Sequence, residues 1–303
     1  MKLVNDERGR TSVLGFLAGF VAFYGPVLGV DGSWTHRIAL VAVSTGVLLA
    51  TFRYFLSTTN FQDLLQIGWR GGLLGLVFAV GTNVMVHGYP TYFGYGSYLA
   101  FLSFFHFSEY VTTSLIKPAS LSLSSYLLNH SRAYHKAAVA SWTEFFLEVF
   151  FFPGMKHRPM LWILGSTLCL IGEGLRKAAM FTAGSNFDHV VQEKKEEGHA
   201  LVTSGVYALC RHPSYLGWFL WSIGTQVLLC NPLCTVGYAV ASWNFFASRI
   251  YSEEITLIDF FGEDYLRYQE RVPSGVPFIK GFQVSLQPEL ESEDEESDRN
   301  ESD

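Results

Sequence analysis

Residues 212–248 read HPSYLGWFLWSIGTQVLLCNPLCTVGYAVASWNFFAS, a run of 37 positions without Asp, Glu, Lys or Arg. A helix that crosses a bilayer needs about 20 mostly apolar residues, so this run is long enough for two helices. Pro232, which follows Asn231, interrupts helical hydrogen bonding near the middle. The run therefore predicts a helical hairpin that brings its first and last residues back to one membrane surface.

Similar charge-free windows occur along most of the chain. The window 71–108 also has room for two helices, with a break near His87-Gly88-Tyr89-Pro90. Together the windows predict an all-α integral membrane protein with about eight transmembrane helices, including the C-terminal hairpin. The segment 118–131 is polar enough to be an interfacial connection. The expected spans lie near residues 13–30, 38–55, 72–88, 96–115, 137–153, 160–181, 214–230 and 233–249.

The composition also indicates a membrane protein. Hydrophobic residues make up 49% of the chain and charged residues only 16%, whereas a soluble domain carries about 25% charged residues. Much of the charge lies in 288–303, which holds nine acids and one base. This acidic tail cannot form a core and is expected to be disordered. The rest of the chain has no strongly basic face, which excludes a nucleic-acid binder.

The distribution of Lys and Arg predicts the orientation in the membrane. With a cytosolic N-terminus, 18 of the 21 basic residues lie on the cytosolic side. The opposite side keeps Arg37, Lys156 and Arg158. Both termini are therefore expected to be cytosolic, as are the two longest polar stretches, 182–211 and 250–303. A water-soluble cofactor would bind on that side.

The sequence lacks the usual signatures of metal and dinucleotide sites. Its four cysteines form neither a disulfide framework nor a zinc-ligand pattern, so we expect core thiols and no metal. No glycine-rich strand-turn-helix motif is present either. A cofactor site would have to be built from helix ends and loops.

Polar residues gather in the loop 182–213 and just after the hairpin. The loop contains His199-Ala200-Leu201-Val202-Thr203-Ser204-Gly205-Val206-Tyr207, followed by Arg211-His212-Pro213-Ser214-Tyr215. Arg249, Glu253 and Glu254 come at the far end of the hairpin. Because the hairpin returns to its starting surface, these residues and the loop are expected to line one pocket.

These stretches resemble the C-terminal core of the isoprenylcysteine carboxyl methyltransferase family. The resemblance is carried by 201–207, by the Arg-His-Pro-Ser-Tyr sequence and by the Glu253-Glu254 pair. Residues 175–187, LRKAAMFTAGSNF, and 271–280, RVPSGVPFIK, are similar to the animal members. Arg-His-Pro alone is a weak signal, because related membrane methyltransferases and sterol reductases share it. The combination is specific.

The resemblance implies an endoplasmic-reticulum enzyme that uses S-adenosylmethionine to methylate the C-terminal carboxylate of a farnesylated or geranylgeranylated cysteine. Its implied partners are prenylated CaaX-type proteins, such as small GTPases, and membrane lipid. It also implies a catalytic membrane core at 136–287 after N-terminal helices at 1–135. Arg249 corresponds to a substrate-side position. The residues that the resemblance assigns to the cofactor are Gln192, His199, Ala200, Leu201, Val202, Tyr207, His212, Pro213, Ser214, Tyr215 and Glu253.

The chemistry explains why these residue types are suitable. An α-carboxyl has a pKa of about 3.5 and is already ionised, so methyl transfer to it needs no general base. An arginine fork matches such a carboxylate, and Arg176 and Arg249 are the candidates. Glu253 would face the cationic cofactor. We therefore expect Arg176, Arg249 and Glu253 to be catalytic.

Other interpretations stay open. Arg176 could anchor a helix end, and Arg249 and Glu253 could form a surface ion pair, since they are four positions apart. Glu144 and Glu148 lie one helical turn apart in an apolar span, where they either line a substrate entrance or form a buried hydrogen-bonded pair. The alternative functions are a phospholipid N-methyltransferase, a sterol reductase or a transporter.

Overall fold

The computed structural model of the chain describes residues 6–31, 61–128, 131–192, 194–195 and 198–284. Within these ranges the protein consists of α-helices, short 3₁₀ turns and loops, without a strand, as the sequence predicted. The expected span 38–55 and the acidic tail lie outside the described residues. The helices are α2 (Glu7–Asp31), α4 (Phe61–His87), α5 (Phe93–Ile116), α6 (Arg132–Phe151), α7 (Pro159–Ala183), α8 (Pro213–Leu228), α9 (Pro232–Phe261) and α10 (Glu263–Arg271).

The expected spans within the described residues coincide with one helix each, but several boundaries and one element differ. Helices α2 and α6 begin five or six residues earlier than expected, at Glu7 and Arg132. Helix α4 begins at Phe61 rather than near 72. Helix α9 continues to Phe261 rather than ending near 249, because no helix breaker occurs before Gly262, which has a φ of 54°. The short helix α10 was not expected. As a result, Glu253 and Glu254 lie within a helix that projects beyond the hairpin.

Proline and glycine mark the ends of the helices around the site. Helices α7, α8 and α9 each begin with proline in the first turn, where its missing N–H would have no helical partner. Gly184 and Gly262 follow α7 and α9 with positive φ, which glycine adopts without steric penalty. The local sequence therefore determines where all three helices start and where α7 and α9 stop.

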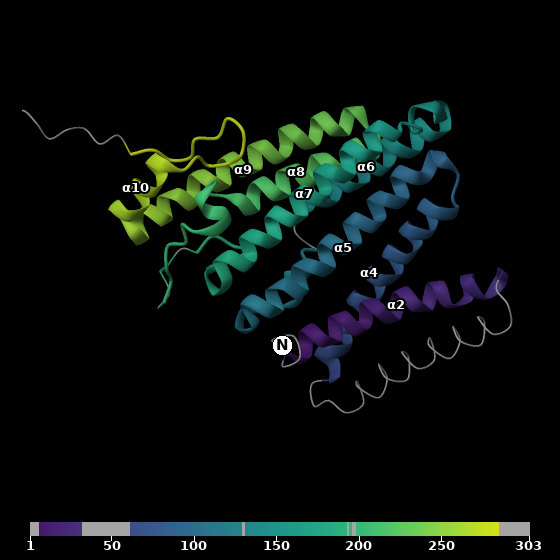
Figure 1. Cartoon of the computed structure of the whole chain (residues 1–303), viewed down its shortest axis with the longest axis horizontal. Helices are drawn as coiled ribbons and strands as arrows, with labels where there is room; N and C mark the ends of the chain where they lie inside the picture. Colours follow the sequence, from purple (N-terminus) through teal and green to yellow (C-terminus); the bar gives the residue numbers. More distant parts are fainter. Residues whose placement is uncertain (1–5, 32–60, 129–130, 193, 196–197, 285–303) are drawn as a thin grey trace, which may run out of the picture.

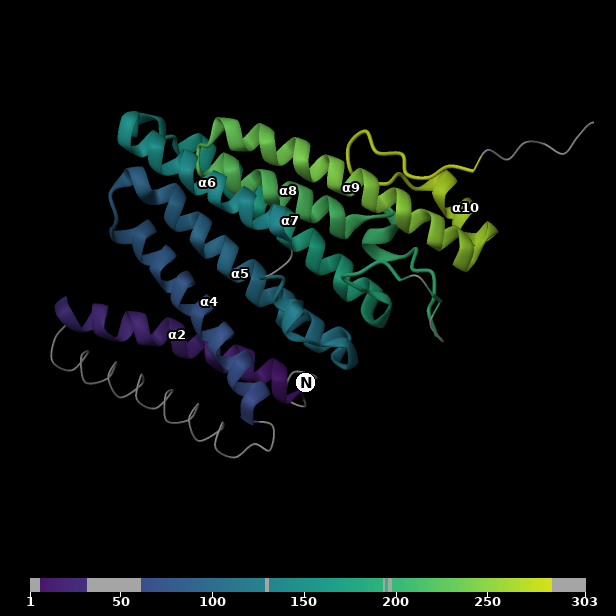
Figure 2. The same cartoon turned by 180° about the vertical axis from the view of Figure 1, so that it is seen from behind.

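The long helices run side by side to form an elongated bundle (Figure 1). Helices α2 and α4 lie on one side, α5 is central and α6 to α9 form the other side, as the view from behind also shows (Figure 2). Helix α5 contacts both α4 and α7. Helix α10 and the loop 184–212 lie at the same end of the bundle (Figure 1). One described helix, α4, is by length and composition apolar enough to cross a membrane.

Small residues let helices α7 and α8 approach closely. A Cβ atom added to Gly172 would lie 2.5 Å from the carbonyl oxygen of Gly217, and one added to Gly217 would lie 2.6 Å from that of Gly172. Any larger side chain would push the two backbones apart. Such small-residue contacts are common between helices in membranes. They hold the start of α8, and with it the Arg-His-Pro sequence, against α7.

The turn of the α8–α9 hairpin is held by a buried lysine. Lys156 donates hydrogen bonds to Glu148 at 2.5 Å, to the carbonyl oxygens of Leu229 and Cys230 at 3.0 Å, and to Asn231 at 2.7 Å. Its side chain is 1% exposed.

The second acid of α6 binds the same turn. Glu144 accepts hydrogen bonds from the backbone N–H groups of Leu233 and Cys234, both at 2.7 Å, at the start of α9. Glu144 and Glu148 therefore do not form the buried pair that was one of the two interpretations. Both are half-buried, and each contributes to the hairpin turn, Glu144 directly and Glu148 through Lys156.

A second buried ion cluster attaches the C-terminal segment 272–284 to the bundle. Glu254 is fully buried and accepts hydrogen bonds from Arg211 at 2.8 Å, His212 at 3.0 Å and Gln269 at 3.0 Å. Arg211 also donates to the carbonyl oxygen of Lys280 at 2.9 Å. The arginine of the Arg-His-Pro sequence thus donates its hydrogen bonds to protein groups, although it also lines the pockets described below.

Replacing Lys156 should strongly destabilise the protein. Lys156→Met leaves Glu148 and the hairpin carbonyls without their buried partner, which we expect to cost about 3 to 5 kcal/mol. Thermal unfolding in detergent micelles measures the effect. Arg158→Met, at a nearby exposed position, is the matched control and should leave the melting temperature within about 2 °C of wild type. Equal melting temperatures for the two variants would contradict this role of Lys156.

Glu254 should make the fold sensitive to acid. Burial raises the pKa of Glu254, but hydrogen bonds and charge from His212 and Arg211 outweigh burial and hold this pKa below its ordinary value of 4.5. A carboxyl whose pKa is lower in the folded state stabilises the fold above the unfolded pKa. That stabilisation is lost as the pH falls through the folded pKa.

We therefore expect the melting temperature of the wild type to fall as the pH drops below 4.5. Glu254→Gln should melt at a lower temperature near neutral pH and should show a shallower decline in acid. Thermal unfolding from about pH 7 to about pH 3.5 tests this, and equal acid slopes for the two proteins would contradict it.

Candidate active site

A pocket lies between the loop 184–212 and the end of α9, and we call it the loop pocket. It contains about 750 Å³ of empty space, part of it open solvent. Nine of the eleven residues expected to bind a cofactor line it: Gln192, His199, Ala200, Leu201, Val202, Tyr207, His212, Tyr215 and Glu253. Pro213 and Ser214 line a smaller adjoining pocket that shares Tyr207, His212, Tyr215 and Glu253. The structure thus brings these residues together, and their binding of a cofactor stays a prediction.

Asp188 and Asn186 hold the loop that forms this pocket. Lys117 donates to Asp188 at 2.5 Å and Gln192 donates to the same carboxylate oxygen at 2.7 Å. The side-chain oxygen of Asn186 accepts from the backbone N–H of Ala200 at 2.9 Å. The loop therefore closes on itself and is tied to the end of α5.

His212 lies between two glutamates. Its Nε2 is 3.0 Å from Glu254, and its Nδ1 is 4.0 Å from Glu253. Because the buried carboxylate of Glu254 accepts hydrogen bonds, Nε2 is the donor, and Nδ1 faces the loop pocket. The ring stacks on Tyr215, with the ring planes 10° apart. His212 therefore links the buried ion cluster around Glu254 to the wall of the loop pocket.

Tyr215 connects Glu253 with Arg249. Its hydroxyl donates to Glu253 at 2.5 Å and accepts from Nε of Arg249 at 3.2 Å. Glu253 is partly exposed, with 28% of its side chain accessible, so it remains open to the loop pocket. Arg249 and Glu253 are therefore connected through the Tyr215 hydroxyl, in place of the direct ion pair that was one of the alternative interpretations.

A second cavity lies beside the loop pocket, and we call it the arginine cavity. It contains about 840 Å³ of empty space, part of it open solvent. Its walls are Ser124, Ser125, Leu127, Arg176, Phe187, Asp188, His189, Val190, Ser214, Tyr215, Trp218 and Arg249. Asp188, Val190 and Tyr215 line both spaces. The two expected carboxylate ligands, Arg176 and Arg249, therefore share one cavity, which is separated from the loop pocket by a thin wall.

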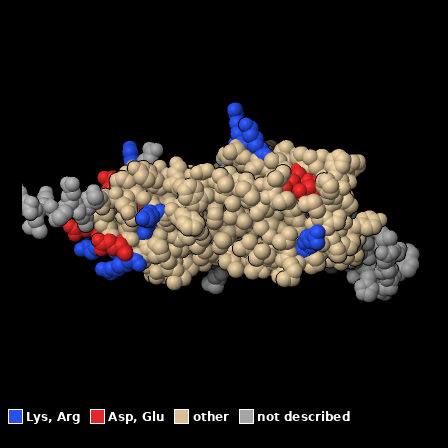
Figure 3. All heavy atoms as spheres, turned by 90° about the horizontal axis from the view of Figure 1, so that it is seen from above, with Lys and Arg blue, Asp and Glu red and all other residues tan. Residues whose placement is uncertain are grey.

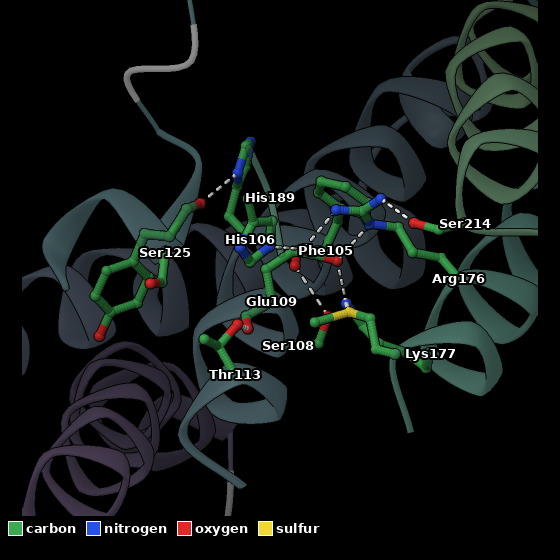
Figure 4. Close-up of polar contacts among 12 residues, drawn as sticks. Phe105, His106, Ser108, Glu109, Thr113, Ser125, Arg176, Lys177, His189 and Ser214 are labelled. Atoms are coloured by element: carbon green, nitrogen blue, oxygen red, sulfur yellow. Dashed lines mark hydrogen bonds and ion pairs between the residues drawn. The ribbon is translucent and has the colours of Figure 1, made fainter. Parts of the chain in front are cut away.

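Arg176 already has a carboxylate partner. Its Nε and Nη2 donate to the two oxygens of Glu109 at 2.6 and 2.8 Å, and its Nη1 donates to Ser214 at 2.7 Å. Figure 4 shows Glu109 at the centre of this cluster, with Lys177 and His189 also directed toward it. The fork of Arg176 thus holds an internal acid, which the sequence analysis did not single out.

Several pocket residues were not expected from the sequence. Phe260 and Phe261 come from the part of α9 beyond the expected end of the hairpin, and Tyr265 and Tyr268 come from α10. A continued 3.6-residue period after Glu253 would have indicated Phe260, seven positions later on the same helical face. Burial raises the pKa of Tyr265 and of Tyr268, so both stay neutral hydroxyls.

Charge on the molecular surface is unevenly distributed. On the face seen from above, the largest group of charged side chains lies at the α10 end, and the middle is mostly uncharged (Figure 3). The loop pocket opens at this polar end. Within the described ranges, no group of three or more His, Cys, Asp or Glu side chains is arranged to hold a metal ion.

Known proteins are similar to this chain over most of its length. The family model described as isoprenylcysteine carboxyl methyltransferase (ICMT) family matches residues 164–259. Protein-S-isoprenylcysteine O-methyltransferases of Xenopus laevis and Homo sapiens are 47% and 49% identical. The Xenopus alignment covers 93% of this chain and 98% of the relative, and the human alignment covers 92% and 96%.

A solved structure is similar over nearly the whole chain. It is described as the eukaryotic intramembrane Ras methyltransferase ICMT, and it matches with a TM-score of 0.80 at 39% identity. The match covers 91% of this chain and 99% of that one. These similarities confirm the resemblance seen in the sequence. The chain belongs to the isoprenylcysteine carboxyl methyltransferase family.

Proposed function

We propose that the protein methylates the C-terminal α-carboxylate of S-farnesyl or S-geranylgeranyl cysteine on processed CaaX proteins, such as small GTPases. The methyl donor is S-adenosylmethionine, and the reaction takes place at the cytosolic face of the endoplasmic reticulum membrane. The observation that carries the proposal is the pair of adjoining spaces that meet at Asp188 and Tyr215. One space suits a polar cofactor and the other holds two arginines for a carboxylate.

The loop pocket suits S-adenosylmethionine in size and chemistry. Pockets for small molecules usually measure about 300 to 1,000 Å³ and combine apolar walls with a few polar groups. The apolar side chains of Leu201, Val202, Leu257, Phe260 and Phe261 line the pocket. Glu253 supplies a negative charge for the cationic donor. His212 stacks on Tyr215 with one ring face, and its other face is available to the adenine. When bound, the donor would supply a methyl group activated on a sulfonium.

The arginine cavity suits the prenylcysteine. The substrate carboxylate is ionised at neutral pH, so the enzyme has to orient it and remove its water rather than deprotonate it. Because the fork of Arg176 is already bound to Glu109, we assign the carboxylate to Arg249. Arg176 adds positive charge to the same cavity.

A membrane location follows from the apolar surface. Monomeric soluble proteins rarely expose large contiguous apolar patches, whereas α6, α7 and α9 expose many large apolar side chains. They include Phe146, Phe150, Phe151, Met160, Ile163, Leu164, Leu170, Ile171, Leu233, Val236 and Val240. Lipid against this surface would let a prenyl chain enter sideways, and each buried CH₂ adds about 0.8 kcal/mol to its binding. We also propose that the protein spans the membrane eight times and that both of its termini are cytosolic.

The proposed function predicts methyl transfer to a prenylated cysteine. Purified protein with labelled S-adenosylmethionine should methylate N-acetyl-S-farnesylcysteine, and N-acetylcysteine without the prenyl group should be at least a hundredfold poorer by kcat/KM, because it lacks the buried chain. Extraction of labelled methyl ester measures the product. Labelling of phosphatidylethanolamine instead would favour a phospholipid N-methyltransferase and would contradict the proposal.

Arg249 and Glu253 should affect different parameters. Arg249→Ala removes the carboxylate ligand and should lower kcat/KM for the prenylcysteine about a hundredfold, close to 3 kcal/mol, with little change in cofactor affinity. Arg249→Lys should recover little activity, because an ammonium group lacks the planar fork. Glu253→Gln should weaken cofactor binding and turnover together. Calorimetry for the cofactor and initial rates for the prenylcysteine measure the two effects.

The matched control for these variants is Arg267→Ala, which removes an exposed arginine of α10 that pairs with Glu263 and Asp264. It should behave as wild type in both measurements. Normal turnover in Arg249→Ala and Glu253→Gln would show that these residues are only surface charges.

A further inference from the structure

Glu109 is a buried acid with no assigned role. It lies in α5, its side chain is fully buried, and it binds residues of two other segments. From α7 it is contacted by Arg176 and Lys177, and from the loop after α7 by His189 at 2.9 Å (Figure 4). A buried carboxylate of this kind is stable only when basic partners surround it. The position of the Glu109 carboxylate therefore depends on these basic side chains, and the positions of the basic side chains depend on Glu109.

The carboxylate determines how Arg176 lies in the arginine cavity. Glu109 binds Nε and Nη2, which fixes the plane of the guanidinium group. That group packs near the rings of Trp218, at 5.0 Å, and Phe105, at 5.7 Å. The remaining nitrogen, Nη1, reaches Ser214 at the wall of the cavity. Because Nε and Nη2 are bound to Glu109, Arg176 presents only the Nη1 edge of its guanidinium group to the arginine cavity.

The same carboxylate also reaches Arg249 through His189. One oxygen of Glu109 binds Nε2 of His189, and the backbone carbonyl oxygen of His189 accepts from Nη2 of Arg249 at 2.9 Å. His189 lines the arginine cavity next to Asp188, which lies in the wall shared with the loop pocket. A single buried acid is therefore connected to both arginines of the cavity.

We propose that Glu109 is a positioning residue for methyl transfer, which orients Arg176 directly and Arg249 through His189. The proposal rests on the function proposed above for the arginine cavity. Since Glu109 does not line the loop pocket, its loss should change how the carboxylate is held and should not change how the cofactor binds. This separation distinguishes positioning from a general contribution to folding.

Glu109→Gln is the sharpest test, because it keeps the shape of the side chain and removes the charge. We expect kcat/KM for N-acetyl-S-farnesylcysteine to fall at least tenfold, with the Kd for S-adenosylmethionine within threefold of wild type. Calorimetric stoichiometry counts the folded sites, so the rate is expressed per binding site. Glu173→Gln is the matched control. Glu173 binds Ser108 and Lys177 in the same cluster, and its loss should leave kcat/KM within threefold.

A second variant tests the connection through the loop. His189→Gln should lower kcat/KM by itself, and adding it to Glu109→Gln should change kcat/KM by less than a further twofold, because both changes break one connection. If the kcat/KM of the double variant fell by the product of the two single-variant losses, the connection through His189 would be overturned.

Two further outcomes are informative. A Glu109→Gln protein with full kcat/KM, or one whose only defect is fewer cofactor sites, would overturn the positioning role. A wild-type protein that binds S-adenosylmethionine but transfers no methyl group to the prenylcysteine would instead overturn the proposed function. The two failures are therefore distinguishable.

Discussion

A charge buried inside an apolar helical bundle is stable only if other groups surround and neutralise it. Lys156, Glu109 and Glu254 each meet this requirement with partners from at least two segments of the chain. Lys156 fixes the turn of the hairpin, Glu109 joins α5 to α7 and the following loop, and Glu254 joins α8 and α9 to the C-terminal segment. These ion clusters orient the helices more specifically than apolar contacts, which tolerate sliding and repacking.

The adjacent acids of α9 show how one helix serves both structure and chemistry. Successive residues on a helix point about 100° apart, so Glu253 faces the loop pocket and Glu254 faces Arg211 and Gln269 of α10. His212 lies within reach of both. Arg211 supports the structure through Glu254, while Tyr215 meets Glu253. The Arg-His-Pro-Ser-Tyr sequence thus contributes both a structural anchor, Arg211, and part of the wall of the loop pocket.

The sequence predicted the features that depend on local chemistry. The charge-free run and Pro232 gave the hairpin, and the spacing of the polar stretches placed the loop beside the end of α9. The sequence did not predict how the buried charges pair, because such pairs join residues that are far apart along the chain. Glu109, for example, lies 67 positions from Arg176. Glu109 nevertheless lies inside the expected span 96–115. An ionisable residue within a transmembrane span is a functional candidate by default, and this is the signal in the sequence that points to Glu109.

Arg176 and Arg249 are each already hydrogen-bonded to other protein groups, which limits how they can hold the substrate carboxylate during the proposed methyl transfer. A free arginine fork grips both oxygens of a carboxylate and engages the lone pairs that must attack the methyl carbon. Arg249 already uses Nε on Tyr215 and one N–H of Nη2 on the carbonyl oxygen of His189, so the side fork formed by Nε and Nη2 is occupied by protein. The N–H groups of Nη1 can hold one carboxylate oxygen and leave the other directed at the donor. The internal hydrogen bonds therefore favour alignment over tight binding of the ground state, which is what raises kcat.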